Sequence, residues 1–386
     1  MRAHSRQRVA LVAPFFGRDL RGRKERYVFA YATNLALEGI DVEVITTTAL
    51  ADASDQSYYR AGTDVTESFP IHRFRVDAPD RVAYEEAVLA ARRGEIGIES
   101  RERALIDERL RSPELLTHLR DSADRYDAFV FVDATAPTTV RGLSDVVENA
   151  VLLPLLDDEP VARLPSVAEA AGRARAILCS TETEASIVAR LFGPAARNRA
   201  RVIGTGVDVV PATPDDLERV RRTTKNRPYL LAVGRDSSDL AGSHGALDVV
   251  RLDGSAERDR AALFACAYAV AVTGEGLGFV PEVFEAWSHG KAVFADERAP
   301  GAAALVREAK AGVVVAPGGW QAVFATLPAA DVLAALGREG NAQVASSGGW
   351  RAVAYRTAEA IDAIAALESR SHDALVAHVA FLYPLV

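Results

Sequence analysis

The stretch "TGEGLGFVPEVFEAWSHGKAVFA", residues 273–295, decides how the second half of the chain folds. Alternating glycines from 274 to 278 follow an apolar run, and Pro281 suits the first position of a helix that Gly290 would end. Glycines permit positive φ angles and expose backbone N–H groups. The N-terminus of a helix also carries a partial positive charge that attracts anions. The stretch therefore predicts a strand, a candidate anion- or sugar-binding loop, a helix and a second strand.

The predicted helix carries Glu282, Glu285 and His289 on one face, since these positions are three and seven residues apart. Carboxylates on this face are suitable acceptors for ribose or sugar hydroxyls. Strand–helix turns without any ligand also contain such glycines, so ligand binding and a plain turn both stay open. A nicotinamide-binding loop is disfavoured, because its glycine pattern opens a domain, whereas these glycines lie late in the chain.

Length and composition limit the kind of protein. A chain of 386 residues exceeds a single ordinary core and predicts two domains. With 49% hydrophobic and 25% charged residues and a net charge of −8, it is typical of a soluble globular protein, and its bulk charge does not attract nucleic acid. Its two cysteines give no disulfide framework and favour the reducing cytoplasm. No apolar run approaches the roughly 20 residues of a membrane span.

Short apolar runs alternate with helical patterns along the whole chain. Continuous Val, Ile and Leu runs separated by helices predict a parallel sheet covered on both faces. The first set of expected strands lies at 8–14, 41–47, 126–134, 149–156, 174–181 and 199–206, with a helix at 25–38. The second set lies at 229–235, 246–254, 268–274, 291–296 and 311–317. The fold class is therefore α/β, with two doubly wound domains.

The polar segment 211–228 separates these two sets and marks a domain boundary. We expect a first domain over 1–208 and a second over 209–370. The charged stretch 77–124 predicts two or three surface helices inserted into the first domain, as a structural insertion or as part of an acceptor site. Residues 371–386 predict an amphipathic helix that ends in apolar residues and must dock on another part of the protein.

Four segments in this order resemble the GT-B glycosyltransferases of family four, the glycosyl transferases group 1, over nearly the whole chain. The segments are "GRKERYVFAYATNLALEGIDVEVITT" (22–47), "RARAILCSTETEASIVARLFG" (173–193) with "RVIGTGVD" (201–208), "YLLAVGR" (229–235) and "EGLGFVPEVFEAWSHGKAVFA" (275–295). The resemblance implies two Rossmann-like domains facing a cleft, with a C-terminal helix crossing back to the first domain. It also implies transfer of a sugar from a nucleotide-diphosphate sugar to an acceptor, with retention of anomeric configuration.

The resemblance further implies that the second domain holds the donor and the first the acceptor, without a metal or other cofactor. Its site residues carry over by position. Catalytic candidates are Glu275 and the strand-end residues Asp133 and Asp157; donor-binding candidates are Arg235, Gly276, Gly278, Phe279, Val280, Glu282, Glu285, Gly22 and Arg23. In this set Arg235 would hold the diphosphate, Glu285 the ribose, and the loop that starts at Glu275 would face the sugar.

Three departures from the family bear on activity. Glu275 and Glu285 are ten residues apart, more than is usual in the family, and Arg23 follows Gly22 where the family has a second glycine. The segment "DSSDLAGSHGALDVVRLDG" (236–254) after Arg235 is shortened and lacks the family's diphosphate-binding lysine. Arg23, Lys24 or His244 would have to replace it.

Two hypotheses therefore stay open. The chain is an active retaining glycosyltransferase with a rearranged phosphate site, or a catalytically impaired GT-B-like protein that serves a true glycosyltransferase as partner or scaffold subunit. The sequence names neither the acceptor nor the donor base. It also leaves a protein partner or a homo-oligomer open.

Overall fold

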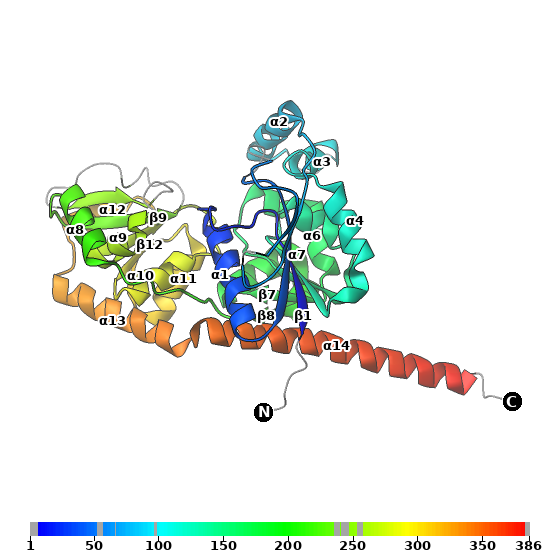
Figure 1. The fold of residues 1–386 in the computed structure, drawn as a ribbon. Helices are drawn as coiled ribbons and strands as arrows, with labels where there is room; N and C mark the ends of the chain where they lie inside the picture. The colour runs from blue at the N-terminus through cyan, green and yellow to red at the C-terminus, as the bar shows by residue number, and fades with distance from the viewer. Residues whose placement is uncertain are drawn as a thin grey trace.

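The computed structural model describes residues 7–51, 57–65, 67–95, 99–234, 240, 247–252 and 258–382. It has two α/β domains side by side, and two successive C-terminal helices run beneath them, α13 (Ala330–Ser346) beneath the second domain and α14 (Gly349–Leu382) beneath the first (Figure 1). Arg235 and His244, both candidates for the phosphate site, lie outside the described residues.

The first domain is built on an eight-stranded sheet in the order β3-β4-β2-β1-β5-β6-β7-β8. Its strands are β1 (Arg8–Val12), β2 (Asp41–Thr47), β3 (Gly62–Asp64), β4 (Ile71–Phe74), β5 (Ala128–Val132), β6 (Ala150–Leu153), β7 (Ala176–Cys179) and β8 (Ala200–Val202). All pairs are parallel except β3 with β4. The central strands β5 and β6 are buried along their full length, as their continuous apolar sequences predict.

Helices cover both faces of this sheet. They are α1 (Arg23–Leu37), α2 (Arg81–Arg92), α3 (Glu99–Asp107), α4 (Pro113–Asp121), α5 (Pro137–Gly142), α6 (Pro165–Arg173) and α7 (Glu182–Arg199), with short 3-10 turns at Ala123–Arg125, Val147–Asn149 and Pro160–Arg163. The insertion 77–124 forms three helices, as expected, but these are not merely surface helices. Leu105, Leu115 and Leu119 are buried in the core of the domain, so the insertion completes one face of the sheet.

The second domain has a five-stranded, fully parallel sheet in the order β10-β9-β11-β12-β13. Its strands are β9 (Tyr229–Gly234), β10 (Asp248–Arg251), β11 (Ala269–Thr273), β12 (Val293–Asp296) and β13 (Gly312–Val315). Its helices are α8 (Pro214–Thr223), α9 (Arg260–Cys266), α10 (Pro281–Ser288), α11 (Pro300–Ala309), α12 (Trp320–Ala325) and α13 (Ala330–Ser346). Each of these strands lies within a predicted segment, and the predicted helix of 273–295 is α10, with Pro281 in its first turn.

The helix that returns to the first domain starts much earlier than expected. The sequence predicted a helix at 371–386, whereas α14 spans Gly349–Leu382. Gly348, just before α14, and Gly349, its first residue, both have positive φ, which sets the turn of the chain from α13 into α14. Val353, Ala354, Ile361 and Ile364 then recur at helical spacing and are buried in the core of the first domain, so α14 docks there before residue 371; the side chains of 367–386 lie outside those described.

Among the helices of the described part of the chain, none is both long and apolar enough to span a membrane. Each sheet has buried apolar residues on both of its faces, as a doubly wound domain requires.

Candidate functional site

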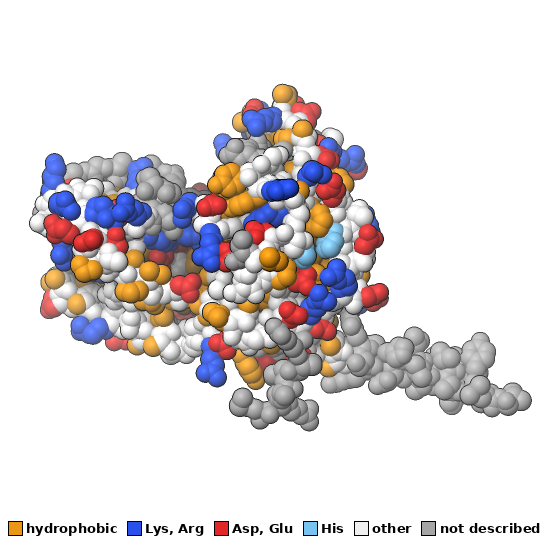
Figure 2. Space-filling view, in the orientation of Figure 1, with side chains coloured by type: hydrophobic (Ala, Val, Ile, Leu, Met, Phe, Trp, Pro, Cys, Tyr) orange, Lys and Arg blue, Asp and Glu red, His pale blue; other side chains and the backbone are white. Residues whose placement is uncertain are grey.

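A cleft of about 540 Å³ lies between the two domains, at the carboxyl ends of their central strands. Parallel α/β sheets place ligand sites at this end, because the strand-to-helix loops converge there. The first domain contributes the N-terminus of α1 and the loop after β5, and the second contributes Gly234, Arg260 and Glu282. Figure 2 shows the hollow between the domains with Lys and Arg side chains around it.

Charged side chains dominate the lining of this cleft. Basic side chains line it from both domains: Arg21, Arg23, Lys24, Arg26, Arg109 and Arg260. The acidic residues of the lining are Glu25, Asp133, Glu159 and Glu282. This excess of basic groups in a confined space suits an anion, and several N–H donors suit phosphate oxygens in particular.

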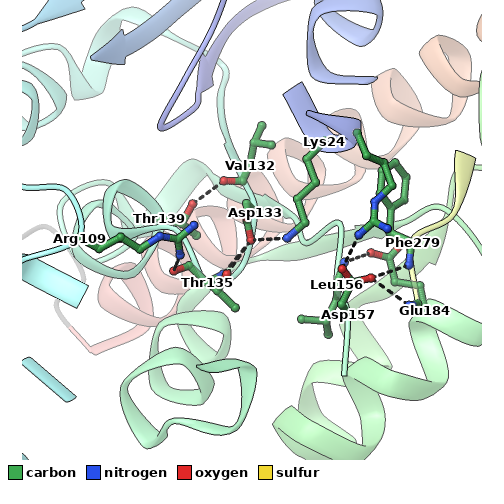
Figure 3. A network of polar contacts seen from close by, with 12 residues as sticks. Lys24, Arg109, Val132, Asp133, Thr135, Thr139, Leu156, Asp157, Glu184 and Phe279 are labelled. Atoms are coloured by element: carbon green, nitrogen blue, oxygen red, sulfur yellow. Dashed lines mark hydrogen bonds and ion pairs between the residues drawn. The ribbon is translucent and has the colours of Figure 1, made fainter. Parts of the chain in front are cut away.

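Asp133 stands at the end of β5, in a backbone conformation that few non-glycine residues adopt. Its φ is +65°, in the left-handed region. Lys24 lies 3.0 Å from its Oδ1, which also accepts hydrogen bonds from the backbone N–H and hydroxyl of Thr135 (Figure 3). Burial opposes ionisation, but Lys24, the nearby Arg109 and the Thr135 bonds outweigh it and hold the pKa of Asp133 below its ordinary value. An ionised Asp133 therefore orients Lys24 at the cleft wall.

Asp157 follows β6 and is almost fully buried. One carboxylate oxygen lies 2.5 Å from Arg23 Nη2. The other accepts hydrogen bonds from the backbone N–H groups of Gly278 and Phe279, at 2.9 and 3.2 Å (Figure 3). Asp157 thus connects the N-terminus of α1 with the glycine loop of the second domain. It is not among the residues lining the cleft.

The glycines of the loop lie against backbone of the first domain. A Cβ atom on Gly276 would come within 2.3 Å of the carbonyl oxygen of Asp158, and one on Gly278 within 2.3 Å of that of Leu156. The Gly276 carbonyl also accepts a hydrogen bond of 2.7 Å from the backbone N–H of Asp158. The family resemblance implied that these glycines bind the donor. In the structure their lack of a side chain permits close packing between the two domains.

The predicted acidic face of α10 meets Arg260 at the start of α9. The Arg260 guanidinium binds both carboxylate oxygens of Glu285, at 2.7 and 2.5 Å, and lies 4.0 Å from Glu282. Burial raises the pKa of Glu285, although Arg260 opposes that shift. His289, on the same face, stacks on Phe264 of α9. The face predicted to bind ribose is therefore covered by α9 around Glu285, and Glu282 lines the cleft.

The structure brings together only part of the predicted site. Arg23, Asp133 and Glu282 line or reach the cleft, and Gly22 caps the N-terminus of α1 beside it. Glu275 is exposed, and neither it nor Gly276, Gly278, Phe279 and Val280 is among the residues lining the cleft. Phe279 and Val280 are buried, Phe279 against Tyr27 of the first domain with ring centroids 4.9 Å apart.

Sequence reasoning missed Arg260, the basic residue that the second domain places in the cleft. The candidates that the sequence offers for the missing lysine, Arg23, Lys24 and His244, lie on α1 or in the segment after Arg235. Arg260 lies on a helix that had not been predicted, and its first-turn position in "RAALFAC" was the only cue to it.

Comparisons with known proteins define the fold. No protein-family model matches the chain, and no curated protein matches it either. Among solved structures, a sucrose-phosphate synthase from Thermosynechococcus elongatus is similar over 94% of this chain and 100% of its own, with a TM-score of 0.64 and 14% identity. Anabaena HepE in complex with UDP-glucose is similar over 92% and 100%, with a TM-score of 0.62 and 14% identity.

An α,α-trehalose-phosphate synthase (UDP-forming) from Burkholderia vietnamiensis is similar over 96% of this chain and 100% of its own, with a TM-score of 0.60 and 12% identity. Likeness at such low identity is evidence for fold alone. The chain accordingly has the GT-B fold, in which two Rossmann-like α/β domains face one cleft.

Proposed function

We propose that this chain is a glycosyltransferase that binds a nucleotide-diphosphate sugar in the cleft between its domains. The observation that carries the proposal is the set of six Lys and Arg side chains from both domains that line one cleft of about 540 Å³. Pockets of roughly 300–1,000 Å³ hold drug-sized ligands. Charge-assisted hydrogen bonds to phosphate are among the strongest polar contacts that a protein makes.

In this proposal Lys24 and Arg26 of α1 and Arg260 of α9 bind the diphosphate. Arg260 replaces the diphosphate-binding lysine that segment 236–254 lacks. It can do so because it lines the same cleft as Gly234, which directly precedes Arg235. Glu285 orients the Arg260 guanidinium through two hydrogen bonds. Asp133 orients Lys24 in the same way.

The chemistry that these groups support is departure of a nucleoside diphosphate from the sugar. Negative charge grows on the leaving phosphate in the transition state, and preorganised cations stabilise it there. We assign the donor to the second domain, 209–370, and the acceptor to the first, 1–208. Retention of configuration, membership of family four and a reaction without metal or cofactor are parts of the same proposal, as inferred from the sequence.

One observation favours the second candidate function, a non-catalytic partner or scaffold subunit. The amides of Gly278 and Phe279 are bonded to Asp157, and Glu275 is exposed, away from the lining of the cleft. A transferase that used this loop for its sugar would need the loop in another position.

Nucleotide binding followed by turnover tests the proposal. UDP, GDP and ADP are titrated by calorimetry and by thermal unfolding; a ligand at 100 times its Kd adds about 2.7 kcal/mol to stability. We expect one of them to bind, and Arg260→Gln to weaken it about tenfold or more, the loss of one charge-assisted bond. Arg307→Gln is the matched control, because Arg307 pairs with the exposed Glu297 of the same domain.

Release of the nucleoside diphosphate from its sugar, with water or a supplied acceptor, then separates the two functions. Binding with turnover supports the transferase, and binding without turnover supports the partner subunit. If none of the three nucleotides binds, the proposal is wrong.

A further inference from the structure

The two domains are joined by a clasp, which we define as Arg23 and Asp157 of the first domain with Gly278 and Phe279 of the second. Its centre is the Asp157 carboxylate, whose side chain is fully buried. That carboxylate accepts one contact from a guanidinium and two from backbone N–H groups. A buried carboxylate needs such partners, because an uncompensated buried charge is strongly destabilising.

Neighbouring contacts position the clasp. Leu155, two residues before Asp157, has a φ of +43° and is buried, an uncommon conformation for a side chain of this kind. The backbone N–H of Leu156 donates to buried Glu184 at 2.7 Å, which fixes the turn. Strained backbone persists where the surroundings over-determine it, and it is often found at functional positions.

Arg23 belongs to both the clasp and the cleft. Its side chain is 14% exposed and lines the cleft, while its Nη2 pairs with Asp157. Its Nε is buried and donates to no acceptor within the described part of the chain. Arg23 is therefore a cation at the cleft wall whose donors Asp157 satisfies only in part, and an anion in the cleft would offer its guanidinium further acceptors if the side chain turned away from Asp157.

We propose that an anion in the cleft competes with Asp157 for Arg23, so that filling the cleft loosens the clasp and frees the amides of Gly278 and Phe279. This inference rests on the proposed function, since the anion is the diphosphate of the donor. Asp157 is then a positioning residue, not a catalytic one. Freed amides of the glycine loop are available to the sugar only once the donor has entered.

Linkage makes the coupling reciprocal, so that a weaker clasp must raise the affinity for the anion by the same factor. The test is Asp157→Asn, titrated with UDP and separately with inorganic pyrophosphate. We expect Asp157→Asn to bind each anion at least about 5-fold more tightly than the wild type does, which is the lower end of typical couplings. Asp158→Asn is the matched control, because it removes the same charge one residue away, where the carboxylate pairs with Arg163 and Arg190.

Hydrogen exchange of the wild-type protein gives a second measurement that does not depend on a variant. We expect UDP or pyrophosphate to speed exchange of the Gly278 and Phe279 amides, the reverse of ordinary protection by a ligand. Without ligand, Arg23→Gln speeds exchange at the same amides, and Lys24→Gln, which leaves the clasp intact, does not.

The inference is overturned if the ligand slows exchange at these amides or leaves it unchanged, or if Asp157→Asn binds no more tightly than Asp158→Asn. Binding of UDP with unchanged exchange refutes only the coupling and leaves the proposed function standing. Binding of pyrophosphate but of no nucleotide refutes the proposed function, and the exchange rates then decide on the coupling. If UDP does not bind but GDP or ADP does, that nucleotide replaces UDP in these tests; if pyrophosphate and all three nucleotides fail to bind, both are refuted.

Discussion

Substitution of Gly278 by alanine tests whether the glycine loop serves the contact between domains. The new Cβ would lie 2.3 Å from the Leu156 carbonyl oxygen and 2.6 Å from Cδ1 of Ile187. Normal contact needs about 3.5 Å, so the loop or the first domain would have to move by about 1 Å. The φ angle of Gly278 is not in the positive region that favours glycine, so the cost of adding a side chain there is steric. Overpacking of this kind typically costs about 1–3 kcal/mol.

Thermal unfolding measures this penalty, which for a chain of 386 residues that unfolds as one unit corresponds to a fall in Tm of roughly 1–4 °C. Gly172→Ala is the control. Gly172 lies in α6, and a Cβ atom added there would have no heavy atom within 4 Å. Alanine there should leave stability unchanged or raise it by up to about 1 kcal/mol. Equal Tm values for the two variants would refute the assignment of Gly278 to domain packing.

Two further predictions concern the first domain. Burial opposes ionisation of Glu43, but hydrogen bonds from Arg8, Tyr126 and His72 outweigh it and lower its pKa from 4.5 to about 2. The ionised Glu43 therefore contributes its full share to the free energy of unfolding above pH 4.5, and this share is lost as the pH falls toward 2. In urea titrations at several pH values, the free energy of unfolding of Glu43→Gln should fall less steeply over this pH range than that of the wild type. Trp350→Ala removes the contact of α14 with Tyr27, whose ring centroid lies 5.0 Å from that of Trp350, and should lower the free energy of unfolding in urea by about 2 kcal/mol. Tyr355→Ala, on the exposed face, should change it by less than about 0.5 kcal/mol.

The sequence was sufficient for most of the fold because the central strands are buried on both faces. Such strands appear as unbroken apolar runs, and segments such as 126–134 and 268–274 each contain the strand that the structure places there. Strand β3, at the edge of the first sheet, and its neighbour β4 were not predicted, since β3 has only three residues and β4 alternates between buried and half-buried positions. Short, partly exposed strands depend on their neighbours more than on their own pattern.

The site was less predictable, because it depends on how two domains meet. Asp157 and Gly278 lie 121 residues apart, and no local pattern indicates that one carboxylate will bond the loop of the other domain. The glycines of 274–278 form the expected loop, but its N–H groups are not exposed: that of Gly276 donates to the Arg298 carbonyl, and those of Gly278 and Phe279 donate to Asp157. Arg260 illustrates the same limit, since its place at the cleft follows from the packing of α9 on α10.

The chain passes between the domains twice, and both passages lie at one place. The first follows β8, where Gly204 and Gly206 lie against Arg356 and Trp350, and the second is the start of α14 itself. Two covalent crossings at one point act as a pivot, which forbids the domains from sliding past each other and leaves rotation as the available motion. Arg23 lies about two turns, roughly 12 Å, along α1 from Tyr31, whose hydroxyl is hydrogen-bonded to that of Thr357 of α14. A small rotation about this point would therefore be magnified at the mouth of the cleft, where the proposed donor enters.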